Sequence, residues 1–281
     1  MTRSWEHGRY IDKREEGVRT FRGRLNGRKR PRFAPRYIGG CCGSAELIKL
    51  ESYLLLDYHR VVHLDMDSLL LGESIDELFH MNKSLIYTND AGMVGKGAAF
   101  APVQGGFLVI KPSRAVYDDL VNIVRVGDFR PGTGWGGVIG WFWGGKTIQG
   151  LLPYYYHKIV PPEMSLKVDI CEYNNMVDTD KCRAIPLEIV KNVHFTVCQK
   201  PWSCKKSHQY ELCGKFHEYW FELRRDLESD YGLPSVNACP KGGGSNYVPI
   251  DMASVQSSTA RLKKGRGWEA SLRRVPLLQP K

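Results

Sequence analysis

The chain has 281 residues, of which 42% are hydrophobic and 25% are charged, enough apolar material for a buried core. This composition excludes a wholly disordered or fibrous protein. No stretch approaches the roughly 18 apolar residues of a membrane-spanning helix, and the Arg-rich start lacks the apolar segment of a secretory signal, so we expect a soluble chain.

The net charge of +10 lies at the two ends of the chain. Residues 1–36 carry 12 Lys and Arg against 4 Asp and Glu, and residues 241–281 carry 8 against 2, which leaves 20 basic and 24 acidic residues between them. Both ends are rich in Gly, Ser, Pro and Arg, a composition typical of solvated tails. We therefore predict a disordered basic segment over 1–36, a globular domain over 37–240 and a disordered basic tail over 241–281.

The first predicted elements are a helix and a strand. Ser44 is a suitable N-cap for an amphipathic helix that runs to Leu56, with apolar residues at helical spacing. The β-branched apolar run at 61–64 then predicts a buried strand, which ends at the acidic triplet 65–67.

The rest of the chain continues this alternation. We predict a strand at 106–110, a helix at 115–126, a Gly-rich loop at 132–145, a short helix at 147–157, a strand at 193–197 and a long helix at 211–231. Alternating strands and helices predict an α/β fold, with a mixed, mostly parallel sheet and helices on both faces.

Eight cysteines leave the compartment open between the cytoplasm and the Golgi lumen. Cys171 and Cys182 bracket a polar loop, and Cys198, Cys204 and Cys213 follow close together, so disulfides and free thiols are both compatible with the sequence. The absence of a C-x-x-C pair argues against a structural zinc site.

Asp65 and Asp67 are the first candidates for chemistry. Side chains two apart on an extended strand point to the same side, so both carboxylates are expected to project from the carboxyl end of the strand while Met66 faces the other way. Ligands bind at that end in open α/β sheets. Two converging carboxylates suit Mg²⁺ or Mn²⁺ bridging to substrate phosphates, although a bare D-x-D triplet also occurs as an ordinary pair of loop acids.

Five segments, in this order, resemble glycosyltransferase family 8, the glycogenin-like and galactinol-synthase-like enzymes. The segments are Leu47-Ile48-Lys49-Leu50, His63 to Leu71 with Ile75 to Phe79, Gln104 to Val109 with Lys111-Pro112-Ser113, Gln149-Gly150-Leu151-Leu152, and His194-Phe195 with Lys200-Pro201-Trp202. Together they cover roughly residues 40 to 205. The resemblance implies a nucleotide-diphospho-sugar transferase fold of the GT-A type over 37–240.

The resemblance also implies roles for individual residues. Asp65, Asp67 and His194 would hold Mn²⁺ or Mg²⁺, and Lys200 would bind the diphosphate of a nucleotide sugar, UDP-linked in this family. Lys49, Gln104 and Gly105 would bind the donor, and Gln149 would lie at the reacting face of the sugar. The implied activity is a metal-dependent, retaining hexosyl transfer to a carbohydrate, protein or polyol acceptor.

The sequence departs from the family pattern at three places. Ile148 stands where the family has Asp, and Gln104-Gly105 stands where it has Asn-Ser. The first forty residues show no convincing strand, so we expect the nucleotide-binding part at the N-terminal side to be incomplete.

Three functions therefore remain open from sequence. The first is the glycosyltransferase, the second is an inactive fold of the same family that serves as a scaffold or carbohydrate-binding protein, and the third is nucleic-acid binding through the basic tails. The tails lack the interleaved aromatic residues of a single-strand binder, so nucleic acid is not favoured. Trp135, Trp141, Phe142 and Trp143 could stack on a carbohydrate acceptor, but a buried aromatic cluster is the favoured interpretation.

Overall fold

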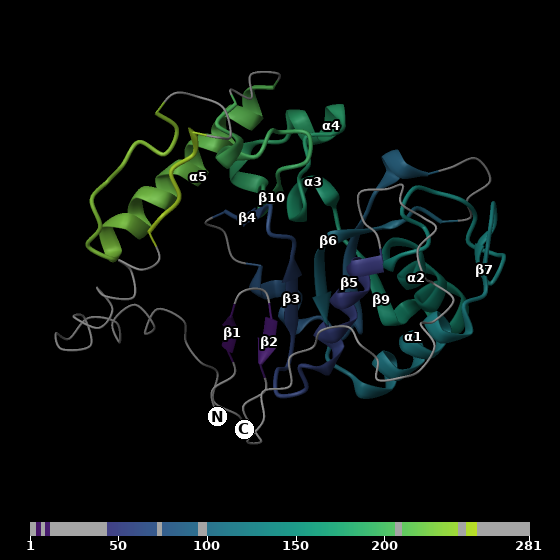
Figure 1. Ribbon diagram of the computed structural model, residues 1–281. Coiled ribbons are helices and arrows are strands. Elements are labelled where there is room, and N and C mark those ends of the chain that lie inside the picture. The colour runs from purple at the N-terminus through teal and green to yellow at the C-terminus, as the bar shows by residue number, and fades with distance from the viewer. Residues whose placement is uncertain are drawn as a thin grey trace.

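The computed structural model describes residues 4–6, 9–11, 44–71, 75–94, 100–205, 210–240 and 246–251. Its centre is a four-stranded sheet in the order β3–β6–β5–β9 (Figure 1). The strands are β3 (Val61–Leu64), β5 (Leu85–Asn89), β6 (Val103–Ile110) and β9 (Ser165–Lys167).

The sheet is mixed, as expected, because one of its four strands runs opposite to the other three. β6 pairs antiparallel with both β3 and β5, whereas β9 pairs parallel with β5. Thus β3, β5 and β9 run in one direction and β6 alone runs in the other. Because β6 lies between β3 and β5, two of the three strand pairings in this sheet are antiparallel. The sequence had predicted a mostly parallel sheet, so the pairing differs from that prediction.

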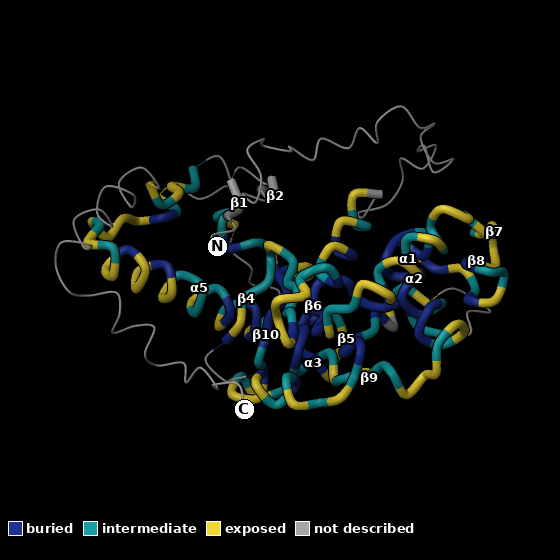
Figure 2. Tube along the Cα trace, turned by 90° about the horizontal axis from the view of Figure 1, so that it is seen from below, coloured by how far each residue is buried: buried dark blue, intermediate teal, exposed yellow. Residues whose placement is uncertain are grey.

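Both faces of the sheet are covered by helical elements. All eight residues of β6 are buried. Leu108 and Ile110 pack in a cluster with residues of η1 (Ser44–Leu54), α1 (Arg114–Val126) and α2 (Ile148–Tyr154). Phe107 and Val109 pack in a second cluster with η2 (Asp76–His80) and α3 (Ile170–Tyr173). A strand buried on both faces explains why residues 107–110 are continuously apolar rather than alternating, and Figure 2 shows this buried centre.

Several predicted elements differ in type or extent. The helix expected at 44–56 is a 3₁₀-helix, η1. The helix α1 begins after Ser113, whose side chain accepts a hydrogen bond from the Val116 amide, and it ends at Gly127 in the left-handed conformation. The helix expected at 147–157 is α2 followed by a π-turn, η4 (Tyr155–Ile159). β8 (Gly134–Trp135) lies within the predicted Gly-rich loop and pairs with β7 (Phe129–Arg130), which lies just before the loop.

A second group of elements lies beside the central sheet (Figure 1). The strand expected at 193–197 is β10 (Asn192–His194), and it pairs antiparallel with β4 (Ser68–Leu70) in a separate ladder. Its apolar cluster joins Val193 and Phe195 to Leu212 and Phe216 of α5 (Glu211–Asp230). Further elements that sequence reasoning did not predict are η3 (Ala91–Met93), η5 (Pro162–Met164), α4 (Asp180–Ala184), η6 (Leu187–Ile189) and η7 (Pro201–Ser203), together with η2, β4, β5, β9 and α3.

In the described part of the chain, three disulfides connect Cys171 with Cys182, Cys198 with Cys213, and Cys204 with Cys239. The first is the pair whose spacing was noted in the sequence. No helix in the described part of the chain is both long and apolar enough to cross a membrane.

The tails predicted over 1–36 and 241–281 lie mostly outside the described residues. Within the first of them, β1 (Ser4–Glu6) pairs antiparallel with β2 (Arg9–Ile11), so the prediction of disorder over 1–36 is wrong for these residues.

Candidate metal centre

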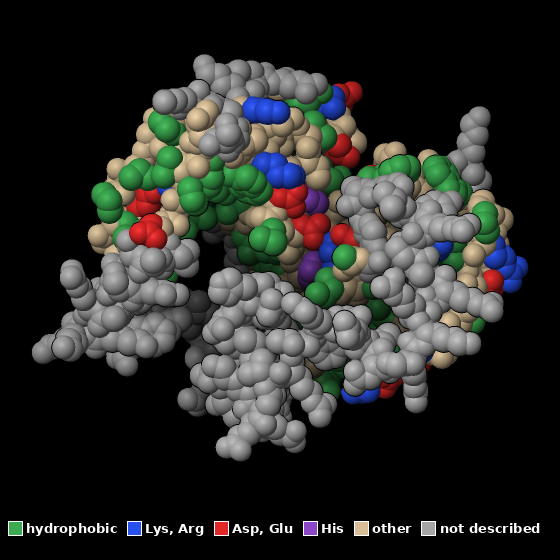
Figure 3. Space-filling view, viewed as in Figure 1, with side chains coloured by type: hydrophobic (Ala, Val, Ile, Leu, Met, Phe, Trp, Pro, Cys, Tyr) green, Lys and Arg blue, Asp and Glu red, His purple; other side chains and the backbone are tan. Residues whose placement is uncertain are grey.

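Three predicted metal ligands converge in the structure. Asp65 directly follows β3, Asp67 precedes β4, and His194 ends β10. Because β10 pairs with β4 so that His194 lies opposite Ser68, the imidazole comes next to the acidic turn. One ligand atom from each of the three side chains lies within 4.8 Å of the others. Acidic and histidine side chains gather on this face beside basic ones (Figure 3).

The two carboxylates converge through a turn rather than along an extended strand. The Ser68 amide donates to the Asp65 carbonyl over 3.0 Å, which closes a turn over residues 65–68. Met66 is 99% exposed at its tip. The expectation that both acids project from the end of β3 is therefore correct for Asp65 only.

Each carboxylate divides its two oxygens between a lysine and the histidine. Asp65 Oδ1 lies 2.8 Å from Lys49 Nζ, and Asp65 Oδ2 lies 4.0 Å from His194 Nε2. Asp67 Oδ2 is paired with Lys200 Nζ, and Asp67 Oδ1 lies 3.2 Å from His194 Nε2. The oxygens that the lysines do not contact are thus the ones that face the imidazole. Two carboxylate oxygens and one imidazole nitrogen around a common point fit Mn²⁺ or Mg²⁺.

The charges of the site are fixed by these contacts. Burial raises the pKa of Asp65, but hydrogen bonds from His63 and Lys49 outweigh it and the pKa is lower than usual. Burial likewise acts against the ionised form of Asp67, yet hydrogen bonds from His194 and Lys200 hold its pKa well below the usual range. Burial lowers the pKa of Lys49, whereas the adjacent Asp65 and Glu46 raise it to a net value above the usual one. Both acids are therefore ionised at neutral pH.

Glycines of β6 allow the site to close. A Cβ on Gly106 would lie 2.5 Å from His194 Cε1 and Nδ1, so the ring rests directly on the strand backbone. The carbonyl of Gly105 accepts a hydrogen bond of 3.1 Å from Lys49 Nζ. Gly105 is thus part of the site through its backbone, which holds the predicted donor lysine.

The two glutamines differ in what they are free to bind. Gln104 Oε1 accepts from the Gly106 amide and from Asn174 Nδ2, and Gln104 Nε2 lies 3.6 Å from Met176 Sδ. Gln104 is therefore tied into internal contacts. Gln149 Nε2 lies 3.9 Å from Met93 Sδ, while its Oε1 is buried and accepts no hydrogen bond from the residues that the structure describes. Of the two, Gln149 retains an unused acceptor.

Two further polar residues, His63 and Asp90, lie near the site and were not predicted. His63 Nε2 lies 3.5 Å from Asp65 Oδ1. Asp90 is 4% exposed, and its pKa is raised by burial and by the nearby charge of Asp178. Asp90 follows the apolar run Leu85–Tyr87 in the same way as Asp65 follows its strand, and this pattern was the signal in the sequence that could have identified it.

Asn175 holds the backbone that carries the histidine. The His194 amide donates to the Asn175 carbonyl over 2.9 Å. The Asn175 side chain donates to the carbonyls of Cys171 and Cys182 and accepts from the Val177 amide. Val177 has φ of 59°, a strained conformation for a β-branched residue. The Cys171–Cys182 disulfide and Asn175 together stabilise this turn beside the metal cluster.

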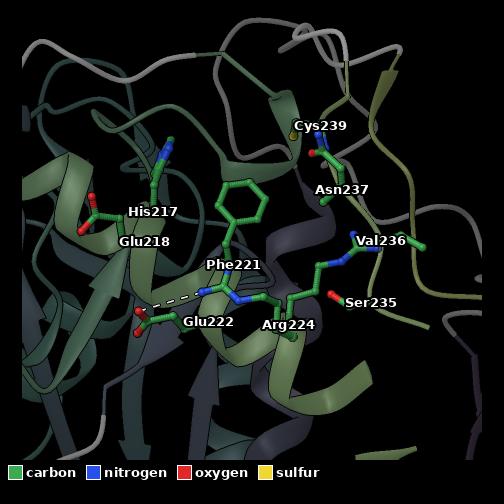
Figure 4. Close-up of a pocket in the computed structure, with 11 residues that line it drawn as sticks. His217, Glu218, Phe221, Glu222, Arg224, Ser235, Val236, Asn237 and Cys239 are labelled. Carbon is green, nitrogen blue, oxygen red and sulfur yellow. Dashed lines mark hydrogen bonds and ion pairs between the residues drawn. The ribbon is translucent and has the colours of Figure 1, made fainter. Parts of the chain in front are cut away.

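A separate cavity of about 630 Å³ lies between α5 and the segment 235–239 (Figure 4). Its lining includes Phe221 and Arg224 of α5, together with Val236 and Asn237 from the facing segment. None of the three predicted metal ligands lines it. Arg224 is 4% exposed and donates to Glu228 over 2.9 Å, so its charge is balanced within the protein.

The chain matches no protein-family model and no curated protein. Its structure is similar to solved glycosyltransferases. One is GlyE of Streptococcus pneumoniae TIGR4, with 15% identity and a TM-score of 0.41 over 72% of this chain and 47% of that chain. A second is galactosyltransferase LgtC in complex with donor and acceptor sugar analogues, with 15% identity and a TM-score of 0.41 over 68% of each chain. A third is mouse xyloside xylosyltransferase 1, with 12% identity and a TM-score of 0.37 over 56% of this chain and 65% of that chain.

These similarities are weak in sequence and in superposition. The chain spans about half the length of GlyE, at 47%. Similarity of this size assigns neither a donor nor an acceptor, and the functional argument rests on the site itself.

Proposed function

We propose that this protein is a metal-dependent glycosyltransferase of the GT-A type, similar to family 8, which transfers a hexosyl group from a UDP-linked sugar to an acceptor with retention of configuration. The observation that carries the proposal is the cluster of Asp65, Asp67 and His194 with a lysine on each carboxylate. The five ordered segments that resemble family 8 support it, since all three ligands and both lysines fall within them.

In the proposed transfer, the metal ion and each residue of the site have different roles. A bound Mn²⁺ or Mg²⁺ would supply Lewis-acid neutralisation of the diphosphate. Lys200 would add a positive charge beside the leaving group, and Lys49, held by the Gly105 carbonyl, would contact the donor. Gln149 would orient the reacting sugar through its amide and does not act as a nucleophile.

The proposed transfer needs no covalent bond between the sugar and a protein nucleophile. The acceptor hydroxyl oxygen forms a bond to the anomeric carbon, and the bond from that carbon to the diphosphate oxygen breaks. The electron pair of the broken bond stays on the diphosphate, which also takes the hydroxyl proton. Attack and departure on the same face retain the configuration.

The proposal is tested by calorimetric titration of UDP into the full chain with and without Mn²⁺. We expect binding that requires the metal and is lost in Asp67→Ala. The matched control is Asp118→Ala, because the Asp118 side chain is 56% exposed on α1 and forms its ion pair with Arg114 on the same helix. Binding that is independent of metal, or that survives Asp67→Ala, would contradict the proposal.

A second candidate function is an inactive fold that serves as a scaffold or binds carbohydrate without transferring it. The engagement of Gln104 in internal contacts and the apolar Ile148 favour it, because both stand where the family pattern has donor-binding groups. A cooperatively folded chain that binds no UDP at any Mn²⁺ concentration would establish this alternative over the first.

We infer that the protein works in the Golgi lumen rather than in the cytoplasm. Three disulfides support this, since such bonds persist in oxidising compartments and are rare where thiols are kept reduced. Alkylation of the protein extracted from its native cells would test it, because free thiols at Cys171 and Cys182 would contradict a lumenal location.

A further inference from the structure

The sequence favoured one buried cluster for the aromatic residues of the Gly-rich segment, but in the structure these residues are divided between the core and the surface. Trp135 and Phe142 are 1% and 3% exposed, whereas Trp141 and Trp143 are 49% and 42% exposed. Phe142 forms an isolated antiparallel bridge with Val94, and alternate residues of an extended segment face opposite sides. The two exposed indoles therefore flank a side chain that anchors the segment in the core.

The segment that carries the two indoles is held firmly. The Gly145 amide donates to the Phe142 carbonyl over 3.1 Å. The backbone amide and the hydroxyl of Thr147 both donate to the Gly144 carbonyl, over 2.9 Å and 2.8 Å. These hydrogen bonds fix the turn that joins Trp143 to the start of α2.

This turn lies against the predicted donor-facing glutamine. A Cβ on Gly144 would come within 1.8 Å of Gln149 Oε1, so the glutamine amide rests on the backbone of the residue that follows Trp143. Gln149 Nε2 in turn contacts Met93, three residues after the buried Asp90. Trp143 directly precedes Gly144, and neighbouring Cα atoms are about 3.8 Å apart. The Cα of Trp143 therefore lies one residue along the chain from the glycine that the Gln149 amide contacts.

The chemistry of the two indoles fits a sugar. Covering an exposed indole removes its apolar surface from water, and the indole also offers an N–H donor. A pyranose ring presents an apolar face together with hydroxyls. An acceptor hydroxyl at the reacting end could donate to Gln149 Oε1, which has no hydrogen-bond partner among the described residues.

We propose that Trp141 and Trp143 form the acceptor-binding platform, and that the acceptor is a neutral carbohydrate whose pyranose rings stack on these indoles. The identification of the bound carbohydrate as the acceptor rests on the proposed function, whereas the binding of a carbohydrate to the two indoles does not. It narrows the acceptor from a protein, polyol or carbohydrate to a carbohydrate.

The test is titration of the full chain, in UDP and Mn²⁺, with maltotriose, cellotriose and xylotriose, followed by saturation-transfer NMR. We expect at least one trisaccharide to bind, and its affinity to fall at least tenfold in Trp143→Ala and in Trp141→Ala. Val138→Ala is the matched control, since Val138 is 45% exposed in the same Gly-rich segment, and it should bind as the wild type does.

The outcomes separate this inference from the proposed function. Absence of trisaccharide binding, or binding that both tryptophan variants keep, overturns the platform. Loss of self-association in the tryptophan variants without any saccharide binding would assign the surface to a second copy of the chain and also overturn it. UDP titration of the same samples is the independent arm: tryptophan-dependent saccharide binding without UDP binding supports the platform and contradicts the transferase.

Discussion

At the scale of single residues, the site is organised by the pairing of opposite charges. Asp65 and Asp67 would repel each other, but Lys49 and Lys200 each take one oxygen and leave the other toward His194. The lysines thus keep both carboxylates ionised and orient them at once. The same lysines are the residues expected to contact the donor.

Asp90 lies beside the site and forms no ion pair with a basic side chain in the part of the chain that the structure describes, which gives a prediction about stability. Burial raises its pKa, repulsion from Asp178 raises it further, and amide donors at Gly92 and Met93 offset this in part. A raised pKa means that the folded state holds the proton more tightly than the unfolded state does. Stability contributed by this group is therefore present below its unfolded pKa and is lost as the pH rises through its folded pKa.

We expect Asp90→Asn to raise the free energy of unfolding at pH 7 by about 1 kcal/mol, because it removes a buried charge and keeps an oxygen for the two amides. The gain should shrink as the pH falls below the raised pKa, where the wild-type carboxyl is already neutral. Thermal melts at pH 7 and pH 4.5 measure it, with the exposed Asp118→Asn as control. A lower melting temperature for Asp90→Asn at pH 7 would show that this carboxylate is not destabilising.

At the scale of elements, the site depends on two strands from different sheets. Strand β6 supplies a flat glycine surface, and β10 places His194 on it through pairing with β4. This contact couples the central sheet to the second group of elements. Gly106 is required there because of the close approach and not because of its backbone angles.

We therefore expect Gly106→Ala to weaken Mn²⁺ binding by about 10- to 100-fold, since a methyl group 2.5 Å from the ring must displace the imidazole. Titration of Mn²⁺ followed by electron paramagnetic resonance measures the affinity. Gly214→Ala on α5 is the control, because its Cβ would meet nothing within 4 Å. The control should keep its metal affinity and gain about 0.5–1 kcal/mol of stability. Equal Mn²⁺ affinity for Gly106→Ala and the wild type would disprove the contact.

At the scale of the whole molecule, covalent and non-covalent stabilisation are unevenly distributed. The three disulfides lie between Cys171 and Cys239, whereas the large apolar cluster around the central sheet contains no cystine. The cluster that packs around α5 includes the Cys198–Cys213 bridge. The smaller cluster thus depends on its cross-links more than the larger one does.

We expect dithiothreitol to lower the melting temperature of the α5 cluster and to leave the central sheet folded over a range of temperature. A bridge spanning 35 residues, as Cys204–Cys239 does, contributes about 3–4 kcal/mol at most. Limited proteolysis with and without reductant would show cleavage beginning in residues 186–240. The Cys204→Ser/Cys239→Ser variant should be partly sensitive without reductant, and a single unchanged transition in reductant would refute the division.

The sequence by itself determined the local features whose causes are local. Ser113 and Gly127 bound α1 because capping needs only neighbouring backbone groups, and the apolar run at 61–64 forms β3. Asp65 and Asp67 were predicted as a metal site from residue type and spacing, whereas His194 and the two lysines were predicted from the resemblance to family 8. The strand β5 was not predicted, although its apolar run Leu85–Tyr87 resembles the run that predicted β3.

Only the tertiary structure decided how these parts meet. The reversed direction of β6, the pairing of β10 with β4 and the closure of the site on Gly106 all join segments distant in sequence. The same holds for the exposure of Trp141 and Trp143, which have the same composition and spacing as a buried cluster would have. Burial depends on what packs against a side chain, and no local pattern specifies that partner.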